Sequence, residues 1–545
     1  MTKYSDIITN VPQTEAVFGK NQVKNNAGGY VFTISDWDRL NRFLILGSEK
    51  NSYYVKGSVL SKENAENVLK LIEQDGCRVV DETVKISDSG RAPKNDPAIF
   101  VMALASAFGN ADVKAYAFRN LNKVCRTATH LFQFVEDVQK FRGWGRGLRK
   151  AIANWYLDKN TSQLVYQVIK YKNREGWTHK DTISLSHPVA VNDDMAYIFN
   201  KIVKGYDEVL PVLDDTNSVI DQFNLGMNFE KYLSEMSGDT VKNAVKLIKK
   251  YNMPRETVPT QLLNEVDIWE ALMSNDGENC TMPITALVRN LAKMTMIGYL
   301  APLSKGTMMV CKALSNKEVI HKSRIHPINI LIALKTYSAG EGFRGSNTWT
   351  PVPAIESALE DAFYLAFDNV EPTNKRYLVA LDVSGSMSWP INDTNLRSCE
   401  VTAAMSMILL KTEPNVHVVG FCNKVVDLGI SKSDKLNSVC KKVVRNNWGG
   451  TDVASAINWA LNNNIEVDVF SIWTDNETWC GVYNHPFQAL QNYREKMEID
   501  AKVIVCATTS TSFSIADPAD KGMLDIAGFD ASVPNIIAEF SKGNI

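Results

Sequence analysis

Two hydrophobic patterns divide the chain. Up to about residue 369, apolar positions recur at helical spacing in short segments that polar turns separate. The segment 97–108 carries a strong start signal, because Asp96 can accept from free backbone N–H groups and Pro97 suits the first helical position. Other segments of this kind cover residues 62–75, 121–137, 148–157, 164–171, 241–251, 285–295 and 328–337. Short helices in series predict a stack of helical pairs, although no repeat of fixed period is present.

The pattern changes near Asn369, where continuous apolar runs begin to alternate with helical segments. The first run, Tyr377–Asp382, ends in an acid. Further runs cover 416–421, 467–473 and 502–507, and helical stretches cover 396–411, 452–462 and 486–496. Buried strands alternating with helices predict a doubly wound α/β fold with a parallel sheet. We therefore predict a helical domain over residues 1–368 and an α/β domain over residues 369–545.

Oxygen-bearing side chains gather at the predicted carboxyl ends of these strands. Asp382, Ser384 and Ser386 follow the first strand at alternating positions. Thr451 lies in a loop before a predicted helix, and Asp475 ends a third strand. Ligands of open α/β sheets bind at this edge. Two carboxylates and three hydroxyls form a hard-oxygen set that suits a divalent cation, above all Mg²⁺, and leaves positions for water or an incoming ligand.

Two other interpretations of these loops are weaker. Asp382 and Ser384 could simply cap a turn and a helix. Some phosphatases place a nucleophilic Asp at such a strand end, but they need a second Asp two residues on, where this chain has Ser384. A metal-dependent hydrolase would lose its turnover in Asp382→Ala. The chain has no P-loop, H-E-x-x-H or G-x-S-x-G motif, and this indicates a protein that is not an enzyme.

A basic stretch lies within the helical part. Residues 140–180 hold ten Lys or Arg against two acids, whereas the whole chain has a net charge of −2. Aromatic residues interleaved with these cations include Trp144, Trp155, Tyr156, Tyr166, Tyr171 and Trp177. Cations attract phosphates, and aromatic faces can stack on unpaired bases. The pattern favours a nucleic-acid-binding surface; the alternative is a solvated face whose aromatic residues, Trp155 and Tyr166 among them, lie in the core.

Composition restricts the class of protein. The chain has 545 residues, of which 45% are hydrophobic and 22% charged, a balance typical of globular proteins with about two to four domains. Its start shows no signal-peptide pattern, and no apolar run is long enough to span a bilayer. The nine cysteines include no C-x-x-C pair, so we expect mostly small core thiols in a reducing, cytoplasmic setting.

Several motifs together resemble one family. Their order and spacing are similar to those of the Ro ribonucleoprotein autoantigens, which combine a helical TROVE module with a von Willebrand factor A-like domain. The matching stretches are Trp144–Tyr156, Lys170–Asp181, Ser186-His187, Leu287–Thr295, Arg324–Pro327, Glu371–Thr373, Asp382–Met387, Gly449–Asp452, Thr474–Thr478 and Ile515–Pro518.

The resemblance implies a ring of HEAT-like helical repeats closed by the A-like domain. The metal-ion-dependent adhesion site of that domain would be formed by Asp382, Ser384, Ser386, Thr451 and Asp475. The resemblance also implies a non-catalytic RNA-binding protein that acts in RNA quality control and stability. Small non-coding Y RNAs would bind its basic outer surface, and single-stranded ends of misfolded or processed RNAs would enter its central hole.

Site residues and partners follow from the resemblance and from the basic stretch. The resemblance implies Lys170, Arg174 and His187 as RNA contacts on the outer surface, and the basic stretch adds Arg142, Arg146, Arg149, Lys172 and Lys180. The predicted contacts nearer the hole are Arg289, Lys293, Arg324 and Arg344. Further expected partners are a protein that supplies a carboxylate to the cation and an exoribonuclease; we expect a monomer without membrane contact. The alternative function is a cation-dependent protein-docking module without RNA affinity.

Overall fold

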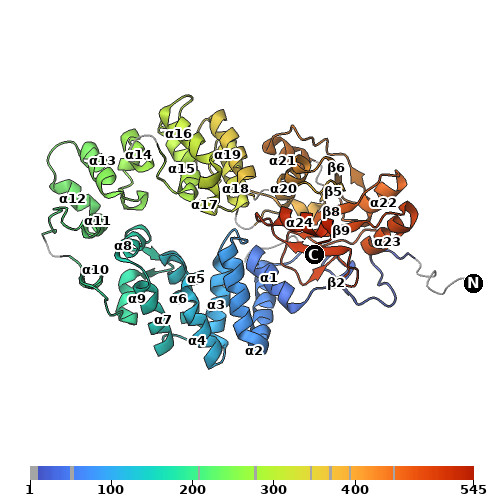
Figure 1. The fold of residues 1–545 in the computed structure, drawn as a ribbon, viewed down its shortest axis with the longest axis horizontal. Helices are drawn as coiled ribbons and strands as arrows, with labels where there is room; N and C mark the ends of the chain where they lie inside the picture. The colour runs from blue at the N-terminus through green and yellow to red at the C-terminus, as the bar shows by residue number, and fades with distance from the viewer. Residues whose placement is uncertain are drawn as a thin grey trace, which may run out of the picture.

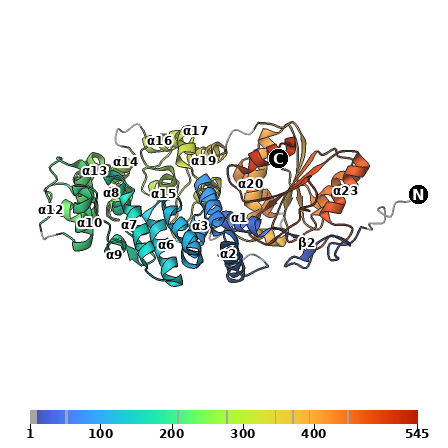
Figure 2. The ribbon, with the colours of Figure 1, turned by 60° about the horizontal axis from the view of Figure 1, so that its bottom comes forward.

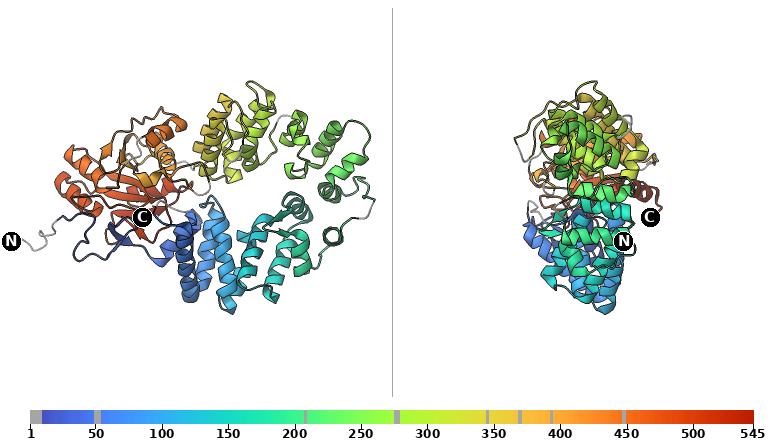
Figure 3. Two further views of the ribbon diagram at one scale, coloured as in Figure 1. Left: turned by 180° about the vertical axis from the view of Figure 1, so that it is seen from behind. Right: turned by 90° about the vertical axis from the view of Figure 1, so that its left-hand side faces the viewer.

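The helices form an elongated ring that the C-terminal α/β domain closes (Figure 1). The structure, a computed structural model, describes residues 10–48, 54–206, 209–274, 279–343, 346–367, 371–391, 394–445 and 449–545. Two arcs of helices extend from the α/β domain and meet at the end of the ring that lies opposite this domain (Figure 1). The view from behind shows the same arrangement of the two arcs (Figure 3). The ring predicted from the sequence is therefore confirmed, whereas the domain boundary predicted at residue 369 lies outside the described residues.

The two arcs follow each other along the chain. The first arc contains α1 (Asp36–Leu46), α2 (Gly57–Ser89), α3 (Asp96–Phe108), α4 (Ala111–Arg119), α5 (Leu121–Val124), α6 (Ala128–Phe141), α7 (Arg146–Leu157), α8 (Thr161–Lys170), β3 (Asn173–Arg174), β4 (Trp177–Thr178), α9 (His179–Ser186) and α10 (Asp193–Lys204). The second arc contains α11 (Ser218–Met227), α12 (Phe229–Glu235), α13 (Thr240–Tyr251), α14 (Val266–Met273), α15 (Ile284–Met296), α16 (Lys305–Leu314), α17 (Lys317–Ser323), α18 (Pro327–Ala339) and α19 (Pro353–Leu365), with 3₁₀ turns at Arg255–Thr257 and Leu262–Asn264.

Local sequence explains where several helices begin and bend. Helix α3 starts at Asp96 with Pro97 in its first turn, as predicted. Helix α2 is longer than the predicted segment 62–75, because it begins at Gly57 and continues beyond a kink at Asp75. At Gly76 a Cβ atom would lie 2.7 Å from the side chain of Val113, so this glycine lets α4 approach α2 closely.

The C-terminal domain is a doubly wound sheet, as predicted. Its strands are β5 (Arg376–Asp382), β6 (Asn415–Phe421), β7 (Val425–Val426), β8 (Val469–Thr474), β9 (Lys502–Ala507) and β11 (Met523–Ala527), in the order β11-β9-β8-β5-β6-β7, with β7 antiparallel to β6 and the other pairs parallel. Its helices are α20 (Ser398–Thr412), α21 (Leu436–Arg445), α22 (Ala454–Asn462), α23 (Pro486–Met497) and α24 (Val533–Lys542), with a 3₁₀ turn at Gly385–Ser388. Figure 2 shows this sheet at one end of the long axis.

Successive side chains of β5 belong alternately to two separate hydrophobic cores. Val379 and Leu381 belong to the core that includes α20, α21 and α24 and is continuous with the helical arcs. Leu378 and Ala380 belong to a second core with α22 and α23. Helices thus cover both faces of the sheet, and this explains why its central strands read as unbroken apolar runs.

The segment before α1 packs on the α/β domain rather than on the helical stack. Strand β1 (Gln22–Lys24) pairs with β2 (Tyr30–Thr33), and β2 pairs with β10 (Phe513–Ser514). Phe32 lies in the core shared with α23, where its ring contacts that of Phe487 at a centroid distance of 5.5 Å. From the sequence, this segment is expected to belong to the helical domain of residues 1–368.

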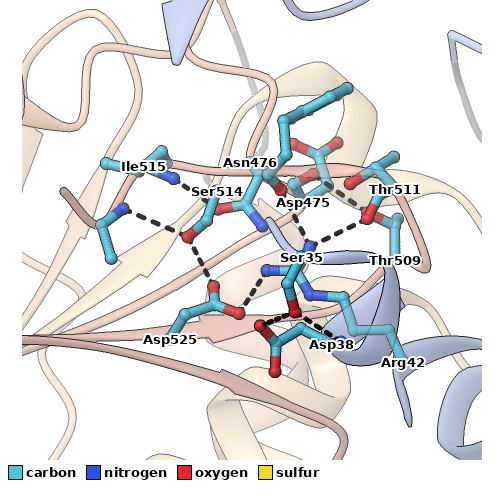
Figure 4. A network of polar contacts seen from close by, with 12 residues as sticks. Ser35, Asp38, Arg42, Asp475, Asn476, Thr509, Thr511, Ser514, Ile515 and Asp525 are labelled. Atoms are coloured by element: carbon cyan, nitrogen blue, oxygen red, sulfur yellow. Dashed lines mark hydrogen bonds and ion pairs between the residues drawn. The ribbon is translucent and has the colours of Figure 1, made fainter. Parts of the chain in front are cut away.

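Both arcs are fastened to the α/β domain by buried or half-buried cations. In α1, Arg42 is 2% exposed; it donates through Nη1 to the carbonyl oxygens of Thr511 (3.1 Å) and Phe513 (2.8 Å) and pairs through Nη2 with Asp525 (Figure 4). In α18, Lys335 donates to both carboxylate oxygens of Glu400 in α20. Each arc therefore has its own polar anchor.

Among the residues that the structure describes, no helix combines the length and apolar character that crossing a bilayer requires. All nine cysteines are free thiols, and Cys125, Cys399, Cys422, Cys440 and Cys506 are buried.

We expect Arg42→Met to lower the free energy of unfolding by about 3 kcal/mol, because it removes the cation that pairs with Asp525 and the donor to two carbonyl oxygens. Chemical denaturation followed by circular dichroism measures this loss. Lys70→Met is the matched control, since Lys70 joins α2 to Asp36 of α1 by an exposed ion pair of 2.6 Å, and its loss should cost under about 1 kcal/mol. Equal losses in the two variants would contradict the anchoring role of Arg42.

Candidate metal centre and nucleic-acid interface

The five predicted metal residues meet at the carboxyl end of the sheet. Asp382 ends β5, and Asp475 directly follows β8, the neighbouring parallel strand. The loop before α22 brings Thr451 to the same edge, and the backbone N–H of Gly385 donates to the carbonyl of Gly449 at 3.2 Å. All five side chains are buried, and none is more than 6% exposed. The structure therefore brings the predicted set together.

Hydrogen bonds fix the first loop of this site. Asp382 accepts from the backbone N–H of Ser384 at 2.9 Å and from the Thr474 hydroxyl at 2.6 Å. The hydroxyls of Ser384 and Ser386 lie 3.1 Å apart. Asp475 accepts from the backbone N–H of Glu477 at 3.0 Å. The carboxylates are thus held in place by neutral donors, while part of their charge remains available.

The site carries negative charge that its own side chains do not balance. Burial and the carboxylate of Asp475 raise the pKa of Asp382 to about 7, and burial also raises the pKa of Asp475. Within the described residues, neither carboxyl forms an ion pair with a Lys or Arg side chain. A bound cation would remove the cost of two neighbouring buried acids.

Thr451 provides an independent test of the fit of a cation. Its hydroxyl is buried and has no hydrogen-bond partner, although its carbonyl accepts from the N–H groups of Trp479 (2.9 Å) and Cys480 (3.1 Å). A cavity of about 80 Å³ adjoins Ser386 and Asp475. Across the described part of the chain, no three His, Cys, Asp or Glu side chains gather as metal ligands, so a cation here needs these hydroxyls. The donor set fits Mg²⁺.

Residues that the sequence analysis did not assign surround this edge. Glu477 accepts from the Asn26 side chain (2.6 Å) and the Ala27 backbone N–H (3.0 Å), and burial followed by the charge of Asp475 raises its pKa to about 8. Burial and the carboxylate of Asp475 raise the pKa of Tyr54 to about 12. Glu477 lies inside the motif 474–478, which was a usable signal, but nothing in the sequence connects Asn26 or Tyr54 with residues more than 400 positions away.

Part of the basic stretch folds as a hairpin beside α6. Strands β3 and β4 pair with each other, and Trp177 of β4 donates through Nε1 to Glu136 of α6 at 2.9 Å. The ring of Trp177 also contacts that of Trp144 in the α6–α7 turn, with centroids 5.9 Å apart. The cations of the turn and of the hairpin therefore belong to neighbouring surface elements.

Most of the predicted outer-surface contacts are solvent-exposed: Arg142, Arg146, Arg149, Lys172, Arg174, Lys180 and His187. Arg146 and Arg149 are exposed on α7, whereas Trp155 and Tyr156 of the same helix are fully buried. The exception is Lys170, which is half-buried and donates to the Tyr166 hydroxyl at 2.5 Å. The aromatic residues at the base of this surface mostly support it and are not free to stack.

His179 has a structural role. It is 4% exposed, and its ring nitrogens lie 2.9 Å from the Tyr156 hydroxyl and 3.0 Å from the carbonyl oxygen of Tyr171. These contacts join the start of α9 to α7 and to the residues that lead into the hairpin. Burial lowers the pKa of His179 to about 4, so it is neutral near pH 7.

The other predicted contacts within the described residues, Arg289, Lys293 and Arg324, lie on the second arc and are not gathered with the first group. Arg289 of α15 is exposed and forms no hydrogen bond or ion pair among the described residues. Lys293 donates to the Asn264 side chain at 2.6 Å, and Arg324 pairs with Asp88 at 3.4 Å. Arg344 lies outside the described residues.

Comparison with known proteins matches both parts of the chain. Residues 23–341 match the TROVE domain, and residues 376–541 match the Ro60 vWA domain. The chain belongs to the Ro60 family. Two proteins named RNA-binding protein RO60 are each 38% identical to it: that of Caenorhabditis elegans over 98% of this chain and 92% of the relative, and that of Deinococcus radiodurans over 98% of both.

A solved structure agrees with this assignment to the Ro60 family. The crystal structure of the Deinococcus radiodurans RO (RSR) protein matches with a TM-score of 0.67 and 35% sequence identity, over 94% of this chain and 100% of that chain. The family resemblance inferred from the motifs is therefore confirmed.

We expect acid to destabilise the helical part through His179. Because burial holds its pKa near 4, its contribution to stability is complete above about pH 6.5 and is lost as the pH falls toward 4, by up to about 3 kcal/mol. Denaturant titrations at pH 7 and pH 4.5 should show a smaller pH effect in His179→Gln than in the unchanged protein. His187→Asn, at an exposed position, is the control; an identical pH effect in all three proteins would refute this role of His179.

Proposed function

We propose that this chain is a non-catalytic RNA-binding protein whose outer contact surface is formed by the exposed cations around the α6–α7 turn, the β3–β4 hairpin and α9. One observation carries the proposal. Arg146, Arg149 and Lys180 are exposed, and none of them has an acidic partner among the described residues. Unpaired exposed cations on adjoining elements attract phosphates without first having to break an ion pair. The relatives named RNA-binding proteins support the same conclusion.

The finer function follows from the family. We infer that structured small RNAs of the Y type bind the outer surface, and that single-stranded ends of misfolded or processed RNAs enter the middle of the ring. Such binding would serve RNA quality control and stability in the cytoplasm, as a monomer and beside an exoribonuclease. The contact between the rings of Trp144 and Trp177 supports this assignment, because it brings the turn that carries Arg142 next to the hairpin that carries Arg174.

We expect the double variant Lys172→Ala with Arg174→Ala to bind a structured RNA about tenfold more weakly. Each substitution removes an exposed cation from the hairpin region, so the slope of log K against log salt should become shallower by about 2. Filter binding at several salt concentrations measures both quantities.

The matched control removes the same charge from the α/β domain. Lys441→Ala with Lys496→Ala changes two exposed lysines in α21 and α23, far from the hairpin along the chain. This control should leave affinity and slope unchanged. If both double variants lose affinity equally, the cations act only through net charge and the assigned surface is wrong.

We further propose that Asp382, Ser384, Ser386, Thr451 and Asp475 hold a divalent cation, and the hard-oxygen ligands favour Mg²⁺. The unpartnered Thr451 hydroxyl and the two unbalanced carboxylates support this assignment. Such an ion can accept a carboxylate from a partner protein. Cation-dependent docking without RNA affinity is therefore the alternative function, and the RNA-binding measurement above separates the two.

We expect Mg²⁺ to raise the melting temperature of the unchanged protein and to have a smaller effect on Thr451→Val. Without a cation, the valine should be tolerated or should stabilise the fold by about 1 kcal/mol, because the Thr451 hydroxyl bonds nothing in the protein. Differential scanning calorimetry with Mg²⁺ or with chelator tests this. Thr402→Val, at a buried hydroxyl of α20 that donates to the Cys399 carbonyl, should keep the full Mg²⁺ effect; equal Mg²⁺ effects in all three proteins would contradict the site.

A further inference from the structure

A cavity of about 320 Å³ lies between α15 and α18 in the second arc. Its volume falls within the range of about 300–1,000 Å³ that is usual for small-molecule sites. In Figure 1, α15 and α18 lie nearer the first arc than α16 and α19 do. The cavity is thus formed by helices on the inner side of the ring.

The walls of this cavity are apolar and partly aromatic. Val288, Leu291 and Ile332 are among the lining side chains. Tyr337 and Trp349 form one side, with their rings stacked at an interplanar angle of 26° and a centroid distance of 6.3 Å. Such walls suit a flat, apolar-faced ligand better than a chain of charged groups.

The two rings are fixed in position by their own hydrogen bonds. Trp349 donates through Nε1 to the carbonyl oxygen of Tyr337 at 2.9 Å. The Tyr337 hydroxyl lies 2.9 Å from that of Thr295 and accepts from the backbone N–H of Val352 at 3.2 Å. Because these polar groups are already satisfied within the protein, the aromatic side of the cavity offers a rigid apolar surface.

Three polar side chains that line the cavity have hydrogen-bonding groups without a partner among the described residues. Within the described residues, the side chains of Thr285, Arg289 and Asn329 form no hydrogen bond or ion pair, and all three line the cavity. The amide of Asn329 offers both donors and an acceptor, and Arg289 is the only charged residue in the lining. The site is therefore cationic and can read the edge of a planar heterocycle.

We propose that this cavity binds one unpaired nucleobase of an RNA strand. The base would lie among the apolar and aromatic walls, the Asn329 amide would hydrogen-bond its edge, and the exposed Arg289 guanidinium would face the attached phosphate. Stacking and edge contacts of this kind are how proteins hold single-stranded RNA. The inference rests on the proposed RNA-binding function, which it extends from the outer cations to a defined position for one nucleotide.

The test uses the full chain and an RNA duplex with a single-stranded 3′ tail. Each tail nucleotide is replaced in turn by an abasic one, and affinities are measured at fixed salt. In the unchanged protein, loss of one base should weaken binding about tenfold, and loss of the others should matter little. Ala333→Trp fills the cavity; it should bind the intact and the abasic tails equally, with the salt dependence unchanged.

A second variant keeps the test valid if Ala333→Trp fails to fold. Asn329→Ala preserves charge and helix propensity, and it should reduce the difference between intact and abasic tails several-fold. Asn290→Ala is its matched control, because Asn290 lies on α15 but donates to the Ala286 carbonyl at 2.8 Å and does not line the cavity. That control should keep the tenfold difference.

The outcomes separate the two levels of the proposal. If the unchanged protein binds RNA but every abasic tail binds as well as the intact one, or if Ala333→Trp and Asn329→Ala keep the full difference, the cavity is not a base site although RNA binding stands. If the protein binds no RNA, both proposals fail.

A competition experiment with free mononucleotides completes the test, because the same stacking and hydrogen-bonding contacts would bind the base of a free nucleotide. Adenosine and uridine monophosphate should compete with the tail only at millimolar concentration and should not bind Ala333→Trp. Micromolar binding of a free nucleotide that leaves RNA binding unaffected would assign the cavity to a nucleotide ligand and overturn the proposal.

Discussion

The architecture depends on the attachment of both ends of one helical array to the same α/β domain. Arg42 fastens α1 to the strand loops at one side, and Lys335 fastens α18 to α20 at the other. Helices stacked in series form an open solenoid unless something joins their ends. The two anchors turn the solenoid into a ring, and the Arg324–Asp88 ion pair and the 3.3 Å contact between His326 Nε2 and the Arg91 carbonyl oxygen join the two arcs directly.

The closed ring also keeps the acidic metal loops apart from the exposed cations of the helical part. The acidic metal loops lie at the junction, where Asn26 and Tyr54 from the N-terminal part of the chain adjoin them. The exposed cations lie around the α6–α7 turn and the hairpin, within the first arc. The net charge of −2 is therefore the sum of a basic surface and acidic metal loops, and in our account RNA and a cation are held at separate places on one protein.

The sequence predicted those parts that depend on local pattern. The strand ends at Asp382 and Asp475 were predictable because buried parallel strands give unbroken apolar runs and their carboxyl ends must meet. The break between α5 and α6 was not predictable from the sequence. Residues 121–137 keep helical spacing throughout, although Thr127 caps a new helix within them. The pairing of β2 with β10 was not predictable either, because it joins residues almost 500 positions apart. The cavity between α15 and α18 depends on how two helices pack, which no single segment encodes.

The central claim is that RNA is held by the cations of the helical part and not by the α/β domain. Photo-crosslinking of the full chain to a bound structured RNA, followed by mass spectrometry of the crosslinked peptides, tests it most directly. Our account predicts that the main crosslinks map to residues 140–190, on the turn, the hairpin and α9. Crosslinks confined to residues 376–541 would contradict it.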